Sequence, residues 1–400
     1  MKGFVMIKSL LDTDFYKFTM MQAVLHHHPG AMTRYEFKWR NWDQMQLRIP
    51  AEDFIGRLKK HLDTLCELRF TEEELSYLDS IHFFKRDFIE YLRLFKLNRA
   101  HIRCRVDKNG EPKITVEGPW LATILFEVPV LATVSELYTE NGPAIGAEWQ
   151  LEGRKRLDNK LSMLEAGLHR DMQFGFADFG TRRRASYEHH EATLLHTINE
   201  VGSRLIGTSN VYLAMKHGLK VIGTMAHEWL QMHQQLGVRL VDSQSDALQT
   251  WSNEYRGELG IALSDCLGFD MFLKDFDRYF ALLFDGCRHD SGDPVWWCEK
   301  LIAHYKSLRI DPKTKTAVFS DGLNFELAIE LFKRFNTEIN VSFGIGTYFT
   351  NDCGFTAPQI VMKVVECNGK PVAKISDSVG KGMCEDDEFL GYLRKVVKER

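Results

Sequence analysis

The feature that most constrains this chain is a repeated alternation, beginning near residue 174, of a short apolar run with a helical stretch. Each run ends in small or polar residues of the kind that occur in turns. The run ends lie at 176–181, 206–209, 221–224, 261–265, 283–286, 318–322 and 342–347. Apolar strands that alternate with helices are typical of a parallel sheet covered on both faces. The pattern therefore predicts about seven βα units.

Seven such units favour a closed or nearly closed barrel over an open doubly wound sheet. The chain also lacks a G-x-G-x-x-G string, which marks the dinucleotide site of many open sheets. We expect the barrel in residues 141–358. It begins at the clearest break in composition, the Asn-Gly-Pro-Ala-Ile-Gly-Ala string at 141–147, and continues with a charged helical segment at 148–168.

Residues 1–140 mix helix and strand patterns in no regular order, which predicts an N-terminal α/β domain. Residues 33–40 alternate charged or hydroxyl side chains with aromatic ones, as in a strand with one exposed face. Residues 52–69 and 71–95 have the pattern of amphipathic helices. Residues 359–376 predict a β-hairpin closed by an Asn-Gly turn, and we expect it to pair with the first domain, so that about 359–400 joins 1–140.

Composition excludes several classes of protein. Hydrophobic residues make up 44% of the 400 residues, enough for a full core, and a formal charge of −4 lacks the basic excess of general nucleic-acid binders. The most apolar run, 120–134, contains Glu127 and Pro129 and is short for a bilayer, so we expect a buried helix and no membrane anchor. Eight cysteines without a C-x-x-C pair, and an N-terminus interrupted by Asp12 and Asp14, favour a cytoplasmic protein with reduced thiols.

Residues that follow the strands of a parallel barrel converge on one rim, and here several of these loops combine glycine with a hydroxyl. Gly344 and Gly346 would let backbone N–H groups approach a phosphate beside the Thr347 hydroxyl, although a tight turn uses the same residues. The strings at 207–210 and 223–224 repeat this chemistry. Three such loops on one rim predict an anion site, with phosphate as the natural ligand.

Two charged loops belong to the same rim. Three arginines at 182–184 follow a predicted buried strand, where guanidinium groups either clamp a pyrophosphate or carboxylate or form a solvated basic turn. The Arg-His-Asp-Ser-Gly-Asp-Pro string at 288–294 contains carboxylates that can hold Mg²⁺ or accept hydrogen bonds from sugar hydroxyls, or else forms an Asp-rich turn. Ser320 begins a weaker version of this loop, Ser-Asp-Gly.

His227 lies near the start of a predicted helix whose N-terminus would face the rim. A single histidine at such a place is commonly a satisfied core residue. A neutral imidazole can also attack a phosphoryl group, with Glu228 or another nearby carboxylate orienting the ring. The other histidines fail the spacing of a zinc site, so we predict none.

Together these strings resemble nicotinate phosphoribosyltransferases of the bacterial type, a type II phosphoribosyltransferase family. The strings lie, in the family's order, at 10–17, 178–184, 207–210, 223–229, 288–294 and 342–347. The resemblance implies an irregular α/β barrel with an N-terminal α/β domain completed by the C-terminal segment. It also implies ATP-coupled transfer of phosphoribosyl from phosphoribosyl pyrophosphate to nicotinate, which releases pyrophosphate, ADP and phosphate and forms nicotinate mononucleotide for NAD synthesis.

The resemblance places the family's phosphorylated histidine on His227. It implies nicotinate contacts by Tyr16, Thr224 and Arg288 and a phosphoribosyl pyrophosphate contact by Thr347. From the chemistry of the loops we add two groups: Asp290 and Ser291 for ribose or Mg²⁺, and Arg182, Ser320, Gly344 and Gly346 for phosphate.

The expected cofactor is Mg²⁺, with ATP as cosubstrate, and the metal ligands stay open. The expected partners are the small-molecule substrates and, because some family members pair, a second copy of the chain. Two alternatives stay open as well: a related transferase that acts on nicotinamide or another pyridine, and a barrel that senses phosphate or nucleotide without catalysis.

Overall fold

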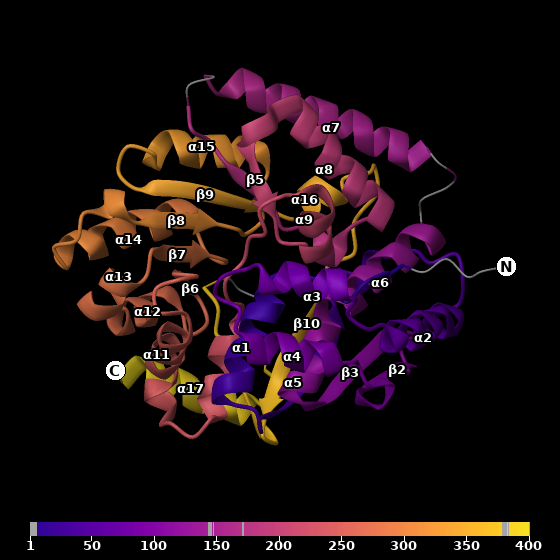
Figure 1. Ribbon diagram of the computed structural model, residues 1–400, viewed down its shortest axis with the longest axis horizontal. Coiled ribbons are helices and arrows are strands. Elements are labelled where there is room, and N and C mark those ends of the chain that lie inside the picture. The colour runs from indigo at the N-terminus through magenta and orange to yellow at the C-terminus, as the bar shows by residue number, and fades with distance from the viewer. Residues whose placement is uncertain are drawn as a thin grey trace.

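The protein is described by a computed structural model, which covers residues 6–142, 146, 148–169, 172–377, 382 and 384–399. Figure 1 shows a parallel sheet surrounded by helices beside a second part that contains the N-terminal helices and an antiparallel sheet. The composition break at 141–147 falls partly outside the described residues, and the proposed domain limits at 140 and 358 stay predictions.

Six short strands form the parallel sheet in the order β5-β4-β9-β8-β7-β6. They are β4 (Phe176–Asp178), β5 (Leu205–Thr208), β6 (Ile261–Leu263), β7 (Gly286–His289), β8 (Thr316–Phe319) and β9 (Asn340–Ile345). Four of the seven predicted run ends contain most of a strand, and the one at 318–322 contains half of β8. The strand end predicted at 283–286 is wrong by about three residues. The apolar residues before it belong to a helix, α13 (Arg278–Leu283), in which Phe280 and Ala281 are buried, and β7 begins only at Gly286.

The predicted strand at 221–224 is also wrong, so the described residues form an irregular barrel of six strands whose edge strands, β5 and β6, are not paired. Only an isolated parallel bridge joins Val221 to Thr208 of β5. The chain then turns, and Thr224 Oγ1 donates to Ile261 O of β6 at 2.9 Å. Among the described residues no ladder joins β5 to β6, so this segment spans the gap with one bridge and one side-chain hydrogen bond.

Helices connect the strands and surround the sheet (Figure 1). They are α7 (Glu148–Gly167), α8 (Tyr187–Val201), α9 (Val211–His217), α10 (His227–Met232), α11 (Ser243–Tyr255), α12 (Phe269–Asp275), α13 (Arg278–Leu283), α14 (Pro294–Ser307), α15 (Phe325–Phe335) and α16 (Thr347–Thr350). Side chains cap several of them: Asn210 accepts from Leu213 N, and Asp293 accepts from Trp296 N with proline at the first helical position of α14. The predicted helix at 148–168 is confirmed as α7.

The antiparallel sheet joins the two ends of the chain, in the order β11-β10-β1-β3-β2. Its strands are β1 (Met32–Trp39), β2 (Ile102–Val106), β3 (Pro112–Pro119), β10 (Ile360–Cys367) and β11 (Lys370–Pro371). The predicted strand at 33–40 is confirmed, and so is the late hairpin, since β10 pairs with β1. Its turn has positive φ at Asn368 and Gly369, as expected for an Asn-Gly hairpin. Figure 1 shows β10 among the N-terminal elements.

The remaining α-helices are α1 (Tyr16–His27), α2 (Ala51–Glu67), α3 (Glu72–Asp79), α4 (Arg86–Leu94), α5 (Trp120–Thr123), α6 (Glu127–Asn141) and α17 (Asp387–Glu399). One predicted helix at 71–95 is wrong, because it is two helices, α3 and α4. In the loop between them, backbone groups bond a side chain of α1 instead of continuing the helix. Phe83 O accepts from the Gln22 amide at 3.0 Å, and Lys85 N donates to the same side chain at 2.7 Å.

Short 3-10 helices complete the chain: η1 (Trp42–Gln44), η2 (Arg99–His101), η3 (Ile124–Phe126), η4 (Thr181–Arg183), η5 (Gly202–Arg204), η6 (His233–Gln235), η7 (Leu240–Asp242) and η8 (Pro312–Thr314).

The apolar run that begins at Trp120 is longer than the sequence suggested. With η3 between α5 and α6 it extends over Trp120–Asn141, 22 residues, which is long and apolar enough to cross a membrane by length and composition. However, 94% of its most apolar window is buried inside the protein, so the predicted buried helix is confirmed.

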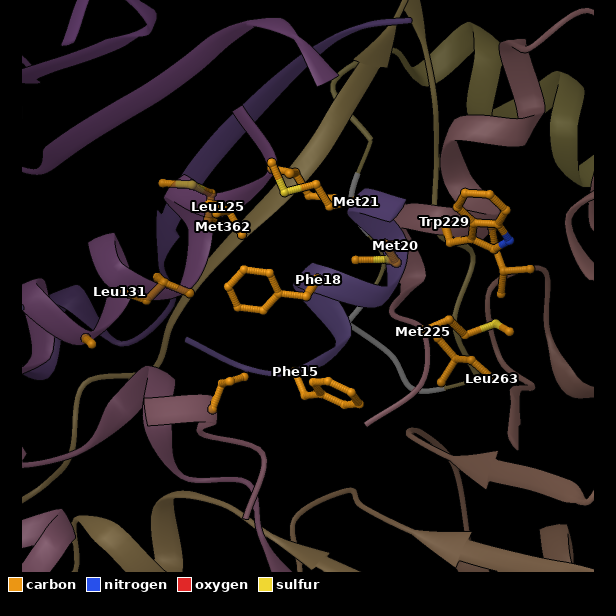
Figure 2. Packing of buried hydrophobic residues seen from close by; sticks show 14 of the residues in the cluster. Phe15, Phe18, Met20, Met21, Leu125, Leu131, Met225, Trp229, Leu263 and Met362 are labelled. Atoms are coloured by element: carbon orange, nitrogen blue, oxygen red, sulfur yellow. The ribbon is translucent and has the colours of Figure 1, made fainter. Parts of the chain in front are cut away.

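One core extends through both parts of the molecule. Figure 2 shows α1 at its centre, with Leu125 and Leu131 on one side and Met225 and Trp229 on the other. Burial of α1 between the antiparallel sheet and the barrel helices fixes how the two parts meet, and the cavity described next lies where they meet.

Candidate active site

A cavity of about 650 Å³ opens between the rim of the barrel and the antiparallel sheet. Eight of the eleven predicted site residues line it: Tyr16, Arg182, His227, Arg288, Asp290, Ser320, Gly346 and Thr347. Segments far apart in the chain therefore meet at one place, as the βα pattern predicted. Three predicted residues, Thr224, Ser291 and Gly344, do not line the cavity.

His227 is the first residue of α10 and faces the cavity. Its Nε2 lies 2.7 Å from Asp265 Oδ1, so Asp265 is the carboxylate that orients the ring. Glu228, the candidate named from sequence, instead accepts hydrogen bonds from Tyr35 and Trp120. Burial and the nearby Lys374 ammonium lower the pKa of His227 despite the Asp265 carboxylate. The imidazole is therefore neutral near pH 7, with Nδ1 left for chemistry.

Asp265 is held by three partners. Besides His227 it contacts Lys374 Nζ at 2.6 Å and accepts from Ser291 Oγ at 2.6 Å. Burial raises the pKa of Asp265, but His227 and Lys374 outweigh burial and bring the pKa well below its usual range. Ser291 thus uses its hydroxyl behind the cavity, so the geometry favours a role in positioning Asp265 over contact with ribose.

The end of β7 and the loop after it bring a cation, Arg288, and a carboxylate, Asp290, to the cavity. Arg288 Nε is buried and lacks a hydrogen-bond partner within the described part of the chain. Asp290 Oδ1 accepts from Ser320 Oγ at 3.1 Å, and Asp290 Oδ2 lies 3.6 Å from His227 Nε2 and 4.0 Å from Lys374 Nζ. A buried guanidinium nitrogen without a partner calls for an acceptor from a ligand.

The three arginines at 182–184 do not act together. Arg182 is 44% exposed and lies in the cavity, 3.9 Å from Asp14 and 3.8 Å from Glu127. Arg183 also lines the cavity, and its Nε donates to Ile360 O. Arg184 points away and forms a fully buried pair with Asp12 at 2.6 Å. Two of the three predicted guanidinium groups can therefore reach a ligand.

The glycine and hydroxyl loops divide in the same way. Gly346 and Thr347 line the cavity, whereas a Cβ on Gly344 would lie 2.3 Å from the Phe179 ring. Packing explains that glycine without a ligand. Thr208 Oγ1 donates to Asp178 Oδ2 at 2.6 Å, and the Thr224 hydroxyl bonds Ile261 as described above, so both hydroxyls serve the fold.

The antiparallel sheet supplies cations that sequence reasoning missed. Arg40 follows β1, Lys363 lies on β10, and Lys374 follows β11; all three line the cavity. Burial lowers the pKa of Lys363 to about 8. Asp265 was missed too, although it ended one of the predicted apolar runs, which was a usable signal. No local pattern marks the lysines, because their place depends on strand pairing across the whole chain.

One group has the composition of a cation site. A ring nitrogen of His227 and carboxylate oxygens of Asp265 and Asp290 all lie within 4.8 Å of one another. Lys374 already supplies a positive charge beside Asp265, so Asp290 is the carboxylate best placed to contact a bound cation.

Comparison with known proteins gives one consistent result. A family model described as the nicotinate phosphoribosyltransferase (NAPRTase) family matches residues 174–400, and a model of that family's N-terminal domain matches residues 11–135. Among curated relatives, the nicotinate phosphoribosyltransferase of Ralstonia pickettii is 50% identical over 98% of this chain and 99% of its own. That of Cupriavidus necator is 51% identical over 98% of each chain.

Solved structures agree with the sequence comparisons. A crystal structure of nicotinate phosphoribosyltransferase from Vibrio cholerae matches with a TM-score of 0.92 and 38% identity over 99% of this chain and 94% of that one. A putative nicotinate phosphoribosyltransferase from Saccharomyces cerevisiae matches with a TM-score of 0.89 and 31% identity over 100% of both chains. The chain, with its cavity between barrel rim and antiparallel sheet, therefore belongs to the nicotinate phosphoribosyltransferase family of enzymes.

Proposed function

We propose that this protein transfers the phosphoribosyl group of phosphoribosyl pyrophosphate to nicotinate, coupled to ATP hydrolysis, in the salvage route to NAD. The observation that carries the proposal is that Arg288, Thr347 and His227 open onto one cavity. Coupling of phosphoribosyl transfer to ATP hydrolysis requires the aromatic acid, the sugar diphosphate and the phosphorylatable imidazole to lie close together in one cavity.

The nicotinate carboxylate pairs with Arg288, whose buried Nε lacks a partner in the described residues. Tyr16, at the start of α1, faces the cavity and can pack against the pyridine ring. A neutral amide could accept a hydrogen bond but would leave the guanidinium without a counter-charge, which supports the acid over nicotinamide as substrate.

The phosphate groups of phosphoribosyl pyrophosphate bind to cations and donors on both walls. Arg182 is suited to this role because its side chain is 44% exposed and its ion pairs within the described residues are long, at 3.8 and 3.9 Å. Arg40, Lys363 and Thr347 line the same cavity, with Gly346 allowing close approach of the ligand. Stabilising the negative charge that develops on the leaving pyrophosphate is the main catalytic requirement.

Nucleophilic attack needs no general base, because the pyridine nitrogen has its own lone pair. The bond from that nitrogen to the anomeric carbon forms as the bond from the carbon to the pyrophosphate oxygen breaks. The protein aligns the two atoms and excludes water from the cationic transition state.

ATP acts through His227. A neutral imidazole nitrogen attacks the γ-phosphorus, ADP leaves, and water later hydrolyses the phosphohistidine to phosphate and free imidazole. Nδ1 is the attacking atom we propose, because Nε2 is bonded to Asp265 at 2.7 Å. The resulting charge change next to both substrates is what would couple hydrolysis to transfer.

Mg²⁺ fits this donor set. Asp290 faces the cavity, and the cation usually binds one or two carboxylates together with substrate phosphates and water. When bound, it would neutralise charge on the leaving pyrophosphate. Asp265 is less suited, because His227, Lys374 and Ser291 already satisfy it.

The test is incubation of the purified protein with nicotinate, phosphoribosyl pyrophosphate and Mg²⁺, with and without ATP. We expect nicotinate mononucleotide in both cases, more with ATP, and acid-labile phosphate on the protein only with ATP. Nicotinamide in place of nicotinate is the matched comparison, and equal turnover would overturn the choice of substrate. Ligand binding without pyrophosphate release would instead support a sensor.

We further propose a cytoplasmic protein, supported by eight unpaired cysteines. A homodimer stays a prediction to be checked by sedimentation. Tyr16 lies in the cavity of its own chain.

A further inference from the structure

A charged cluster extends from the cavity wall, where Tyr35, Glu127 and Glu228 lie, to the buried Lys17 behind it, and the reaction steps above do not use it. The fully buried Lys17 ammonium contacts the Glu228 carboxylate and lies 2.6 Å from Glu127 Oε2. Tyr35 Oη and Trp120 Nε1 both donate to Glu228 Oε1, at 2.6 and 2.5 Å. Two carboxylates thus share one buried ammonium, and two neutral donors add to the bonds of one of them, Glu228.

Each half of the central ion pair is the chain neighbour of a residue that faces the ligands. Lys17 follows Tyr16 at the start of α1, and Glu228 follows His227 at the start of α10. Successive residues of a helix point about 100° apart, so Tyr16 faces the cavity while Lys17 faces the interior. Glu228 borders the cavity beside His227 and contacts the buried Lys17. The ion pair therefore joins the two helix starts that present the pyridine-binding tyrosine and the phosphorylatable histidine.

The same cluster reaches the phosphate-binding side of the cavity. Glu127 lies 3.8 Å from Arg182 Nη1 as well as 2.6 Å from Lys17. A ligand phosphate that draws Arg182 away from Glu127 changes the charge balance around Lys17. Three groups that we expect to contact ligands are thus connected to this cluster: Tyr16 and His227 as chain neighbours of its members, and Arg182 by its contact with Glu127.

Stability alone is a weak reason for such a pair. Burying two charges costs about as much as their attraction returns, and well-packed apolar side chains often do as well or better. The surroundings here are apolar and aromatic, including Trp120 and Trp229 at a centroid distance of 5.9 Å. A buried pair instead fixes the relative position of two elements, since neither charge can be left without its partner.

A second contact holds the same two segments together. Thr19 Oγ1 donates to Thr224 O at 2.6 Å, and a Cβ on Gly223 would lie 3.1 Å from Tyr16 N. The start of α1 therefore packs directly on the segment that leads into α10.

We propose that the Lys17–Glu228 ion pair is the positioning link by which phosphorylation of His227 alters nicotinate binding at Tyr16. In this proposal both are positioning residues: Lys17 lies outside the cavity lining, and Glu228, which is buried at the edge of the cavity, acts through its contact with Lys17. The inference rests on the proposed function and deepens it: phosphate on His227 moves the start of α10, Glu228 moves Lys17, and Lys17 moves Tyr16.

The test uses Glu228→Gln, Lys17→Met and the double variant, with two readouts. The first is the ratio of kcat/KM for nicotinate with ATP to that without ATP. The second is labelling of the protein by γ-labelled ATP. We expect labelling to stay within about threefold of the parent while the ratio falls by about tenfold or more, the size of a typical coupling between sites. The double variant should lose no more than either single variant, because the pair acts as a unit.

Asp12→Asn is the matched control. It cuts another fully buried pair, Asp12 with Arg184, in which neither residue lines the cavity. It should lower the melting temperature and leave the ATP ratio unchanged. A ratio within twofold of the parent in Glu228→Gln would overturn the link, and so would an equal fall in Asp12→Asn.

Equilibrium binding separates this inference from the proposed reaction. If labelled parent protein binds nicotinate more tightly than unlabelled protein, and Glu228→Gln abolishes the difference, the link between the two helix starts is supported. Failure of the parent protein to form mononucleotide would overturn the proposed reaction and leave the link standing. Equal tightening of binding in parent and Glu228→Gln would remove the link alone.

Discussion

Two histidine–aspartate pairs in this molecule have the same geometry and different surroundings. His227 Nε2 lies 2.7 Å from Asp265, and His190 Nε2 lies 2.7 Å from Asp178. Asp178 ends β4 and Asp265 follows β6 by two residues, so both carboxylates occupy the same end of the parallel sheet. The His190 side chain is fully buried, whereas the His227 side chain is 15% exposed and lines the cavity.

The comparison shows that access to the cavity, rather than the histidine–aspartate pair itself, distinguishes a pair that can react with a ligand from one that stabilises the fold. Thr208 and the backbone of Gly180 complete the bonds to Asp178, which ties β4 to β5 and α8. Two arginines repeat the contrast: Arg184 is buried against Asp12 and Glu136, and Arg288 faces the cavity with an unpaired Nε among the described residues.

The strongest way to break the comparison is to change both histidines. His227→Asn should abolish labelling by γ-labelled ATP and all ATP stimulation while leaving slow transfer without ATP. His190→Asn should keep labelling and lower the free energy of unfolding by about 1–3 kcal/mol, because it disturbs a buried hydrogen bond. Labelling of the protein and urea unfolding measure the two effects. Loss of labelling in His190→Asn would contradict the distinction.

The arginines should differ next most strongly. Arg288→Ala should reduce kcat/KM for nicotinate by about 30- to 150-fold, equivalent to about 2–3 kcal/mol for leaving a carboxylate without its cation. Arg184→Met should instead lower stability, since Asp12 and Glu136 lose their shared partner. Steady-state kinetics over a range of nicotinate concentrations checks the first variant. Unchanged nicotinate saturation there would remove Arg288 from this role.

The two aspartates sharpen the comparison further. Asp265→Asn should slow labelling by about tenfold or more, because the imidazole loses its orienting carboxylate. Asp178→Asn should leave the labelling rate within about twofold and reduce thermal stability, in line with a structural hydrogen-bond network. Rapid-quench labelling at saturating ATP gives both rates, and equal slowing in both variants would count against the assigned roles.

The smallest expected effect is on pH dependence. Burial and Lys374 lower the pKa of His227, and only the neutral ring can attack ATP. The labelling rate should therefore rise with pH, with a midpoint below 6.5, and be level at pH 7 and above. Lys374→Met removes one cause of the lowered pKa and should move the midpoint upward. A profile with the same midpoint in both proteins would show that Lys374 does not act on this ring.

Sequence patterns predicted the elements whose side chains alternate or repeat locally. The strand at Met32–Trp39, the late hairpin and most of the parallel strands follow from periodicity and turn residues. Prediction failed where a short apolar run had a different use. Residues 221–224 bridge the gap between β5 and β6, and residues 283–286 span the end of α13 and the turn before β7, which begins at Gly286.

The same division holds for the site. Residues at the ends of parallel strands, such as Arg288 and Asp290, could be assigned to one rim because topology alone brings such positions together. Lys363 and Lys374 could not, because they reach the cavity only through pairing of β10 with β1 across more than 300 residues.

The sequence by itself determined the βα order, the kinds of side chain at the rim and the family resemblance, because these depend on residues close together in the chain. Tertiary structure alone decided which histidine has access to the cavity, which carboxylate orients it and which cations face the ligands. Those outcomes depend on burial and on charges brought together from distant segments, and the free energy of a buried charge is set by all of its neighbours at once.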